Sequence, residues 1–183
     1  MSQFLTHTAV SPQGESRWQA EVHRGWRIGS VANGGYVLAL VGRTLAEALN
    51  QPDPLSINAF YLAPVALGEV EVAVESLSET RSTHFASADL RQEGELKLRA
   101  TAAYTDLDRL SGPDWTNVAP PEVPAFDDVA APAMSHLEIH QSIDLRMGFA
   151  SSPVQSLPDK LSVPCQYTSH LRIGASRKLP LTC

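Results

Sequence analysis

One apolar segment, residues 33–49, constrains the fold of this chain more than any other feature of its sequence. It reads NGGYVLALVGRTLAEAL and predicts a helix of about 17 residues, or roughly 25 Å at 1.5 Å per residue. Only Arg43, Thr44 and Glu47 are plainly polar, so apolar side chains surround most of the helix axis. We therefore expect other elements to enclose this helix, which forms the buried centre of the domain.

The sequence after the helix predicts its end and then a strand. Pro52 and Pro54 stop the helix, because proline has no amide proton and the residue before a proline avoids helical backbone angles. Residues 55–62 are rich in aromatic and β-branched side chains, and Pro64 and Gly68 close the segment with a loop. The buried helix is thus expected to lead directly into a strand.

Three more strands are expected up to residue 105. The valines within residues 69–75 alternate with three glutamates and one alanine, a period of two that predicts one buried and one exposed face. Turns at residues 79–82 and 93–94 separate a strand at 83–92 from a last strand. The apolar face of that last strand comprises Leu96, Leu98, Ala100, Ala102 and Tyr104. Hairpin-linked strands form an antiparallel sheet, so the predicted fold class is α+β.

The second half of the chain has a different composition. Residues 106–135 hold five of the 13 prolines and six acids against one base, which is typical of a linker. Residues 136–147 alternate and predict one more strand, and the tail beyond Gly148 shows no sustained periodicity. We accordingly divide the chain into a domain at 1–105, a proline-rich acidic linker at 106–135, and one strand with an irregular tail at 136–183.

The charge of the chain argues against two classes of partner. There are 14 Lys and Arg residues against 20 Asp and Glu, a net charge of −6, and no basic cluster. Nucleic acids and anionic membranes are bound through basic patches, so neither is expected here.

The apolar runs and the cysteines indicate where in the cell the protein is expected. The longest apolar run, Tyr36 to Val41, is far shorter than the ~20 residues that span a bilayer. The first ten residues lack the basic region and the apolar core of a secretion signal, so we expect a cytoplasmic protein. Cys165 and Cys183 fit neither a disulfide framework nor a metal-ligand spacing, and we expect free thiols.

Three motifs resemble the acyl-CoA thioesterases of the TesB-like double hot-dog family. They are WRIGSVANGGY at residues 26–36, AFYLAP at 59–64 and RSTHFASA at 81–88, in the family's order and spacing within residues 17–105. The resemblance implies a hot-dog fold, an antiparallel sheet wrapped around one long central helix, and the hydrolysis of acyl-CoA thioesters. Family members continue through a proline-rich linker into a second repeat, and residues 136–147 resemble its opening strand. Residues 136–183 would then be a truncated second repeat.

The start of the helix is the predicted catalytic site. Gly34 and Gly35 let a ligand approach the backbone, and first-turn amides have no partner within their own helix. With Asn33 as the N-cap, these amides and the helix dipole can hold the oxyanion that forms on a thioester carbonyl. The alternative interpretation is a cap and a tight turn without chemistry. Since the family's best-described catalytic carboxylate lies in the second repeat, we expect the general base to come from a partner chain or from a complete second repeat.

Three further residues are predicted to bind the substrate. Tyr36 would line the acyl channel, although a first-turn aromatic residue also suits the core. Arg81 and His84 lie in the turn and strand that resemble the family. His23 and His84 could assist in activating water, since histidine titrates near neutral pH, or could be ordinary strand residues.

A metal site is considered and not favoured. His136, Glu138 and His140 would share one face of a strand, and two histidines with a carboxylate can bind iron or zinc. Their spacing is not that of the helical His-Glu-x-x-His motif, and one edge strand rarely closes a site. Nucleotide-binding glycine loops and the Gly-x-Ser-x-Gly elbow are absent from the sequence. We expect no metal and no cofactor.

The sequence therefore predicts an acyl-CoA thioesterase. Two alternatives stay open: a non-catalytic acyl-CoA binding or assembly subunit, and a hot-dog hydratase or dehydratase acting on the same thioesters. Because a lone hot-dog sheet leaves an edge exposed, and exposed edges recruit partners, we also expect a homodimer.

Overall fold

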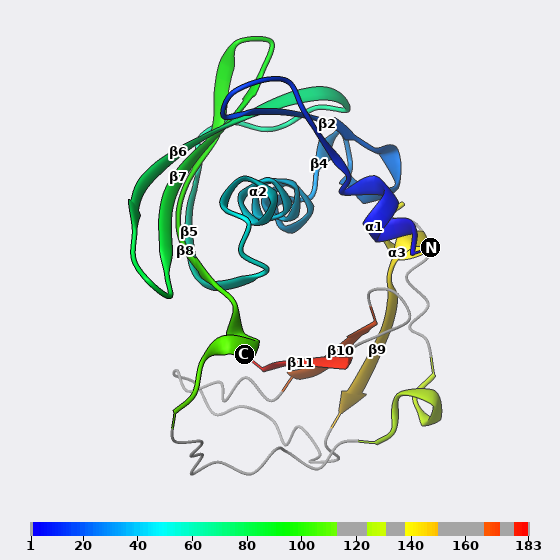
Figure 1. Cartoon of the computed structure of the whole chain (residues 1–183). Coiled ribbons are helices and arrows are strands. Elements are labelled where there is room, and N and C mark those ends of the chain that lie inside the picture. The colour runs from blue at the N-terminus through cyan, green and yellow to red at the C-terminus, as the bar shows by residue number, and fades with distance from the viewer. Residues whose placement is uncertain (1, 113–123, 131–137, 150–166, 173–177, 183) are drawn as a thin grey trace, which may run out of the picture.

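The structure is a computed structural model that describes residues 2–112, 124–130, 138–149, 167–172 and 178–182 (Figure 1). Up to residue 105 it contains two helices, a short 3-10 helix and eight strands. In chain order they are α1 Gln3–His7, β1 Val10–Pro12, β2 Arg17–Val22, η1 Arg24–Trp26, β3 Arg27–Ile28, β4 Val31–Ala32, α2 Gly34–Leu49, β5 Asp53–Tyr61, β6 Gly68–Glu79, β7 His84–Gln92 and β8 Glu95–Thr105.

Six of these strands form one antiparallel sheet in the order β1-β2-β6-β7-β8-β5. The sheet curves around α2, which Figure 1 shows almost end-on at its centre. Strands β3 and β4 pair with each other just before α2. This arrangement of a wrapped antiparallel sheet and one long central helix confirms the α+β class and the hot-dog fold.

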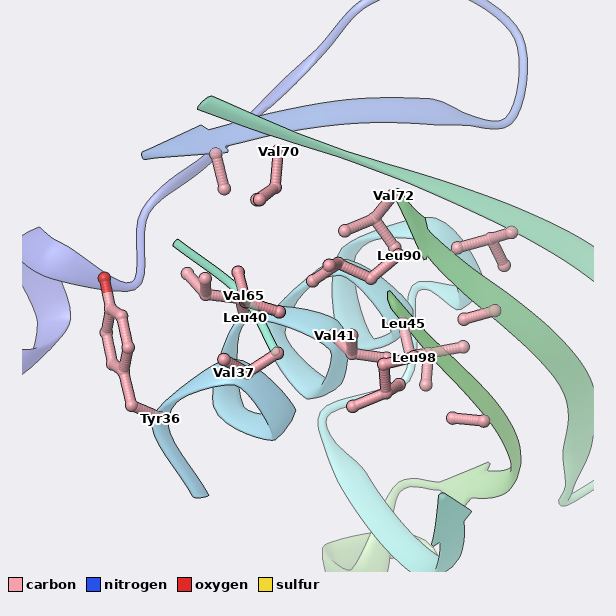
Figure 2. Packing of buried hydrophobic residues seen from close by; sticks show 14 of the residues in the cluster. Tyr36, Val37, Leu40, Val41, Leu45, Val65, Val70, Val72, Leu90 and Leu98 are labelled. Atoms are coloured by element: carbon pink, nitrogen blue, oxygen red, sulfur yellow. The ribbon is translucent and has the colours of Figure 1, made fainter. Parts of the chain in front are cut away.

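The core lies between α2 and the concave face of the sheet (Figure 2). Leu40, Val41 and Leu45 of α2 are fully buried. They pack against alternate residues of the central strands, among them Val70, Val72, Val74, Ala86, Ala88, Leu90, Leu98 and Ala100. The period-two burial in β6, β7 and β8 is the pattern expected for strands with one face on a helix.

Both ends of α2 follow local rules. Asn33 caps the first turn, since its side-chain oxygen accepts a hydrogen bond from the Tyr36 amide at 3.2 Å. Asn50 adopts a left-handed conformation at φ 49° and ends the helix. Thr44, expected as a polar position, is instead buried, because its hydroxyl donates a hydrogen bond of 2.9 Å to the Leu40 carbonyl.

Two strand boundaries depend on backbone geometry. The turn between β7 and β8 has positive φ at Glu93 and Gly94, 52° and 80°, as two-residue hairpins require. Strand β5 begins at Asp53, two residues before the predicted start, and includes Pro54. Proline is tolerated there because β5 is an edge strand that pairs with β8 alone within the described residues.

After residue 105 the structure differs from the prediction. Its elements are η2 Leu107–Arg109, η3 Phe126–Asp128, α3 Ile139–Ser142, β9 Asp144–Phe149, β10 Tyr167–Arg172 and β11 Lys178–Thr182. The strand predicted at 136–147 was wrong in part, because residues 139–142 form a helix that buries Ile139 in the core, and the strand runs from Asp144 to Phe149. Residues 136 and 137 lie outside the described part.

The predicted irregular tail also contains regular structure. Strands β9, β10 and β11 form a three-stranded antiparallel sheet in the order β11-β10-β9. The two later strands have six and five residues, which is too short for a sustained period of two in the sequence. Proline is accepted in β11 because that strand lies at the sheet edge. The domain boundaries at 105 and 135 stay predictions.

Within the part of the chain that the structure describes, no helix combines the length and the hydropathy needed to cross a bilayer.

Candidate functional site at the start of helix α2

The first turn of α2 contains two backbone amides without a described partner. The Tyr36 amide donates to the Asn33 side chain, and the Val37 amide donates to the Asn33 carbonyl at 3.0 Å. Within the described residues we find no acceptor for the N–H groups of Gly34 and Gly35. Such amides, together with the positive end of the helix dipole, favour an oxygen atom that carries negative charge.

Two backbone hydrogen bonds position the residues before this turn. The Asn33 amide donates to the Trp26 carbonyl at 2.8 Å, and the Ala32 amide donates to the Val65 carbonyl at 2.9 Å. These bonds tie the entry of α2 to η1 on one side and to the loop after β5 on the other. The cap residue is therefore fixed by long-range contacts as well as by its own side chain.

Tyr61, at the end of β5, lies over the first residue of the helix. Its hydroxyl donates a hydrogen bond of 3.0 Å to the Gly34 carbonyl, and its side chain stays about half exposed. A Cβ atom at Gly34 would lie 3.2 Å from Tyr61 Cε1, a tight contact that the ring would have to yield to by a few tenths of an ångström. Burial raises the pKa of the phenol above its ordinary value. Sequence reasoning missed this residue, although it lies in the AFYLAP motif.

The second glycine protects the cap. A Cβ atom at Gly35 would lie 3.1 Å from the Asn33 side-chain oxygen that accepts the Tyr36 amide. A small residue at this position therefore keeps the cap intact and leaves the amide accessible, since Gly35 itself is exposed. Asn33, Gly34 and Gly35 are thus brought together as the sequence suggested, and their catalytic role stays a prediction.

Tyr36 lies in the core. It is 3% exposed, and its ring stacks on Trp26 with 5.4 Å between ring centroids and 10° between planes. Figure 2 shows its hydroxyl pointing away from the apolar cluster, toward the N-terminal part of the chain. There it lies 2.6 Å from the His7 carbonyl and accepts from the His23 amide at 3.3 Å, and burial raises its pKa. This buried position does not support the substrate-binding role predicted for Tyr36.

Arg81 lies at the opposite end of the central helix. It lines a shallow depression together with Gln51, which follows the last residues of α2. The 16 residues of α2 span about 24 Å, so the structure does not bring Arg81 to the two glycines.

His84 also lies away from the helix start. It pairs across the sheet with Tyr104, whose hydroxyl donates to the Gly42 carbonyl in the middle of the helix. Its Nε2 lies 2.8 Å from the Ser76 hydroxyl, and its buried Nδ1 has no hydrogen-bond partner among the described residues. Within one chain, Arg81 and His84 do not lie beside Gly34 and Gly35. Their substrate-binding roles stay predictions.

The sequence predicted that His136, Glu138 and His140 share one face of a strand, and the structure differs from this prediction. Glu138 forms ion pairs with Arg24, at 2.7 Å, and with Arg27, and the hydrogen bonds from these arginines lower its pKa. His140 lies in α3, and His136 lies outside the described residues. No group of three potential metal ligands gathers in the described ranges.

Comparison with known protein families finds one match, which includes the helix start. Residues 22–105, which contain β3 to β8 and the whole of α2, match the model of the acyl-CoA thioesterase N-terminal domain. The matched residues make up a little under half of the chain, and they are similar to that domain throughout. The match agrees with the TesB-like resemblance of the three motifs, and it covers the helix start, Tyr61, Arg81 and His84.

Solved structures support the same fold for the thioesterase domain. The similar structures include a candidate thioesterase II from Thermobifida fusca YX, with 27% identity, a TM-score of 0.70, and coverage of 80% of this chain and 55% of that one. Acyl-CoA thioesterase II TesB2 from Mycobacterium marinum has 17% identity, a TM-score of 0.67 and coverage of 93% and 60%.

A hot-dog protein of unknown function from Alicyclobacillus acidocaldarius has 21% identity, a TM-score of 0.72 and coverage of 94% and 62%. This chain thus spans 55% to 62% of the length of these three structures. No curated protein sequence matched the chain.

Proposed function

We propose that this chain binds acyl-CoA and takes part in the hydrolysis of its thioester, with the carbonyl oxygen at the amides of Gly34 and Gly35. The observation that carries the proposal is the pair of first-turn amides without a described acceptor, in a domain of the thioesterase family. The acyl chain would run along α2. The non-catalytic binding subunit is the main alternative.

Hydrolysis of a thioester by water requires a site that stabilises the oxyanion, and it does not require a nucleophilic side chain. Water attacks the thioester carbonyl, the oxygen gains negative charge, and the carbon–sulfur bond then breaks to release the acid and the CoA thiol. Two amides at a helix start can stabilise that oxygen, and losing one such donor typically costs ~10²–10³ in rate. The exposed position of Gly35 leaves room for the substrate to reach the backbone.

The general base is proposed to come from outside the helix start. His23 stacks on His7 rather than standing free, and His84 lies toward the other end of the domain. A partner chain or another segment would supply the group that takes the proton from water. We accordingly propose a homodimer as the working form, acting on acyl-CoA in the cytoplasm as part of fatty acid metabolism.

Three assays on the purified full chain test the proposal. Release of free thiol from acyl-CoA marks hydrolysis, and a change in enoyl absorbance marks the hydratase alternative. Acyl-CoA binding measured by calorimetry, without turnover, marks the binding subunit. Absence of both turnover and binding would reject the proposal and its alternatives together.

A further inference from the structure

A histidine in the N-terminal helix is tied to an indole that can only donate. The Nδ1 atom of His7 lies 3.0 Å from Nε1 of Trp26 and accepts its hydrogen bond. Because indole nitrogen is a donor only, Nδ1 carries no proton in this structure. The imidazole of His7 is therefore neutral, with its hydrogen on Nε2.

The same contacts hold α1 on the domain. Phe4 packs edge-on against Trp26 with 5.3 Å between ring centroids, and the His7 carbonyl accepts from the Tyr36 hydroxyl at 2.6 Å. Helix α1 has five residues, too few to be stable by itself in water. Its position hence depends on Trp26 and Tyr36.

Trp26 connects this helix to the candidate site. Its ring packs against Phe4 of α1 and stacks on Tyr36. Its carbonyl accepts a hydrogen bond of 2.8 Å from the Asn33 amide. Asn33 in turn caps the Tyr36 amide beside the two glycines. A short chain of direct contacts thus runs from His7 through Trp26 to the cap of α2.

The surroundings of His7 disfavour its charged form. The His23 ring stacks on it with 4.1 Å between centroids and 19° between planes. Burial, and secondly the charge of His23, lower the pKa of His7 from its ordinary value of 6.5. Of the other ionisable groups nearby, the charge of Glu21 raises the pKa of the Tyr36 phenol, and Arg24 is paired with Glu138.

We propose that neutral His7 is a positioning residue for the start of α2, and that its protonation in mildly acidic solution releases α1 and loosens Trp26 and the Asn33 cap. A proton on Nδ1 removes the acceptor for the indole, and two charged, stacked imidazoles repel each other. The conformational part of this proposal is independent of thioester hydrolysis. Its effect on turnover rests on the proposed function.

The direction of the pH effect follows from linkage. Because the pKa of His7 is lower in the folded protein, the released state binds more protons, so the docked state is favoured as pH rises. Well above pH 6.5 His7 is neutral in both states, and docking does not depend on its titration. Docking weakens as pH falls below 6.5.

The test uses the full chain, with the indole proton resonance of Trp26 and rate-corrected amide protection of α1 and residues 33–36 measured between pH 8 and pH 5. We expect both signals to change together below pH 6.5. In His7→Asn the side-chain oxygen can still accept from the indole but does not titrate, so both signals should stay docked at pH 5. His7→Ala should show released α1 at every pH.

Two further variants separate the effect of His7 protonation on α1 from general effects of acid on the fold. His23→Gln should move the transition to lower pH, since it removes the charge that repels protonated His7 in the docked state, and His84→Asn should leave it unchanged. A transition that persists in His7→Asn, or an indole signal that does not change down to pH 5, would overturn the proposal. If acyl-CoA is never hydrolysed while the transition follows His7, the proposed function fails and this inference stands.

Discussion

The hydroxyl of Tyr61 donates a hydrogen bond of 3.0 Å to the carbonyl of Gly34, and this bond joins the end of an edge strand to the start of the central helix. The two residues are 27 positions apart in the sequence. The ring fits there because Gly34 has no Cβ, which would lie 3.2 Å from Tyr61 Cε1. Tyr61 therefore borders the amides that we propose for the thioester oxygen.

Replacing Tyr61 tests this contact. Tyr61→Phe removes the hydrogen bond and keeps the ring, so we expect a loss of unfolding free energy at the low end of ~0.5–1.5 kcal/mol, because the site is half exposed. Urea unfolding measures it. Phe60→Leu, at the more exposed neighbouring position, is the control and should change stability less. Equal stability of Tyr61→Phe and the parent chain would show that the bond contributes nothing.

A β-branched residue at Gly35 should block the helix start. Gly35→Val places a Cβ 3.1 Å from the Asn33 side-chain oxygen and covers the exposed amide. We expect acyl-CoA binding to be lost while the circular dichroism spectrum of the fold is retained. Calorimetry measures the binding.

The matched control for Gly35→Val is Gly42→Ala, within the same helix. Its added Cβ makes an ordinary contact of 3.4 Å with the Tyr104 hydroxyl. Binding should be unaffected, and helix propensity favours alanine. If Gly35→Val stays folded and binds acyl-CoA with parental affinity, the carbonyl site is not at this turn.

Most of the fold could be predicted because its signals are local. The alternation of Val70, Val72 and Val74 and the apolar run of α2 each arise from one element facing one core. The edge position of Pro54 and the docking of Ile139 depend on strand order and tertiary contact, which the pattern of a single segment does not contain.

The candidate site was predictable only in part, for the same reason. Asn33, Gly34 and Gly35 are consecutive, so their proximity is certain from sequence. Tyr61 and His7 reach the helix start through contacts between distant segments, and no spacing rule relates them to it. Arg81 lay in a recognisable motif, but a motif does not say at which end of the helix its turn will lie.

The core should respond strongly to truncation of α2. Leu40 is fully buried in the core cluster, so Leu40→Ala should cost about 2–5 kcal/mol of unfolding free energy. Leu38→Ala, on the partly exposed side of the same helix, should cost clearly less. Similar losses for both variants in urea unfolding would contradict the packing described for α2.

The free edge of β5 predicts self-association. Leu55, Phe60 and Leu62 are 49%, 67% and 56% exposed, on or just after a strand that pairs with β8 alone within the described residues. Exposed apolar edges recruit other strands, so light scattering at micromolar concentration should report a homodimer. Phe60→Lys should shift it toward monomer, whereas Leu77→Lys, at an exposed position of β6, should not. A monodisperse parent monomer would reject the dimer.

The outer face of the sheet predicts an acid-sensitive ion pair. Arg99 donates two hydrogen bonds of 2.6 Å to the Asp89 carboxylate, which lower the pKa of Asp89 below its ordinary value of 3.8. Because the depressed carboxyl pKa favours the folded state, the stabilisation is complete above pH 3.8 and is lost as pH falls through the folded pKa. Arg99→Ala should therefore be less stable than the parent at pH 7, by a small amount, since exposed pairs are screened by water. The difference in unfolding midpoints should become smaller as pH falls from 7 to 2.5. A difference that is equal at the two pH values would mean that Arg99 acts through its packing and not through the charge of Asp89.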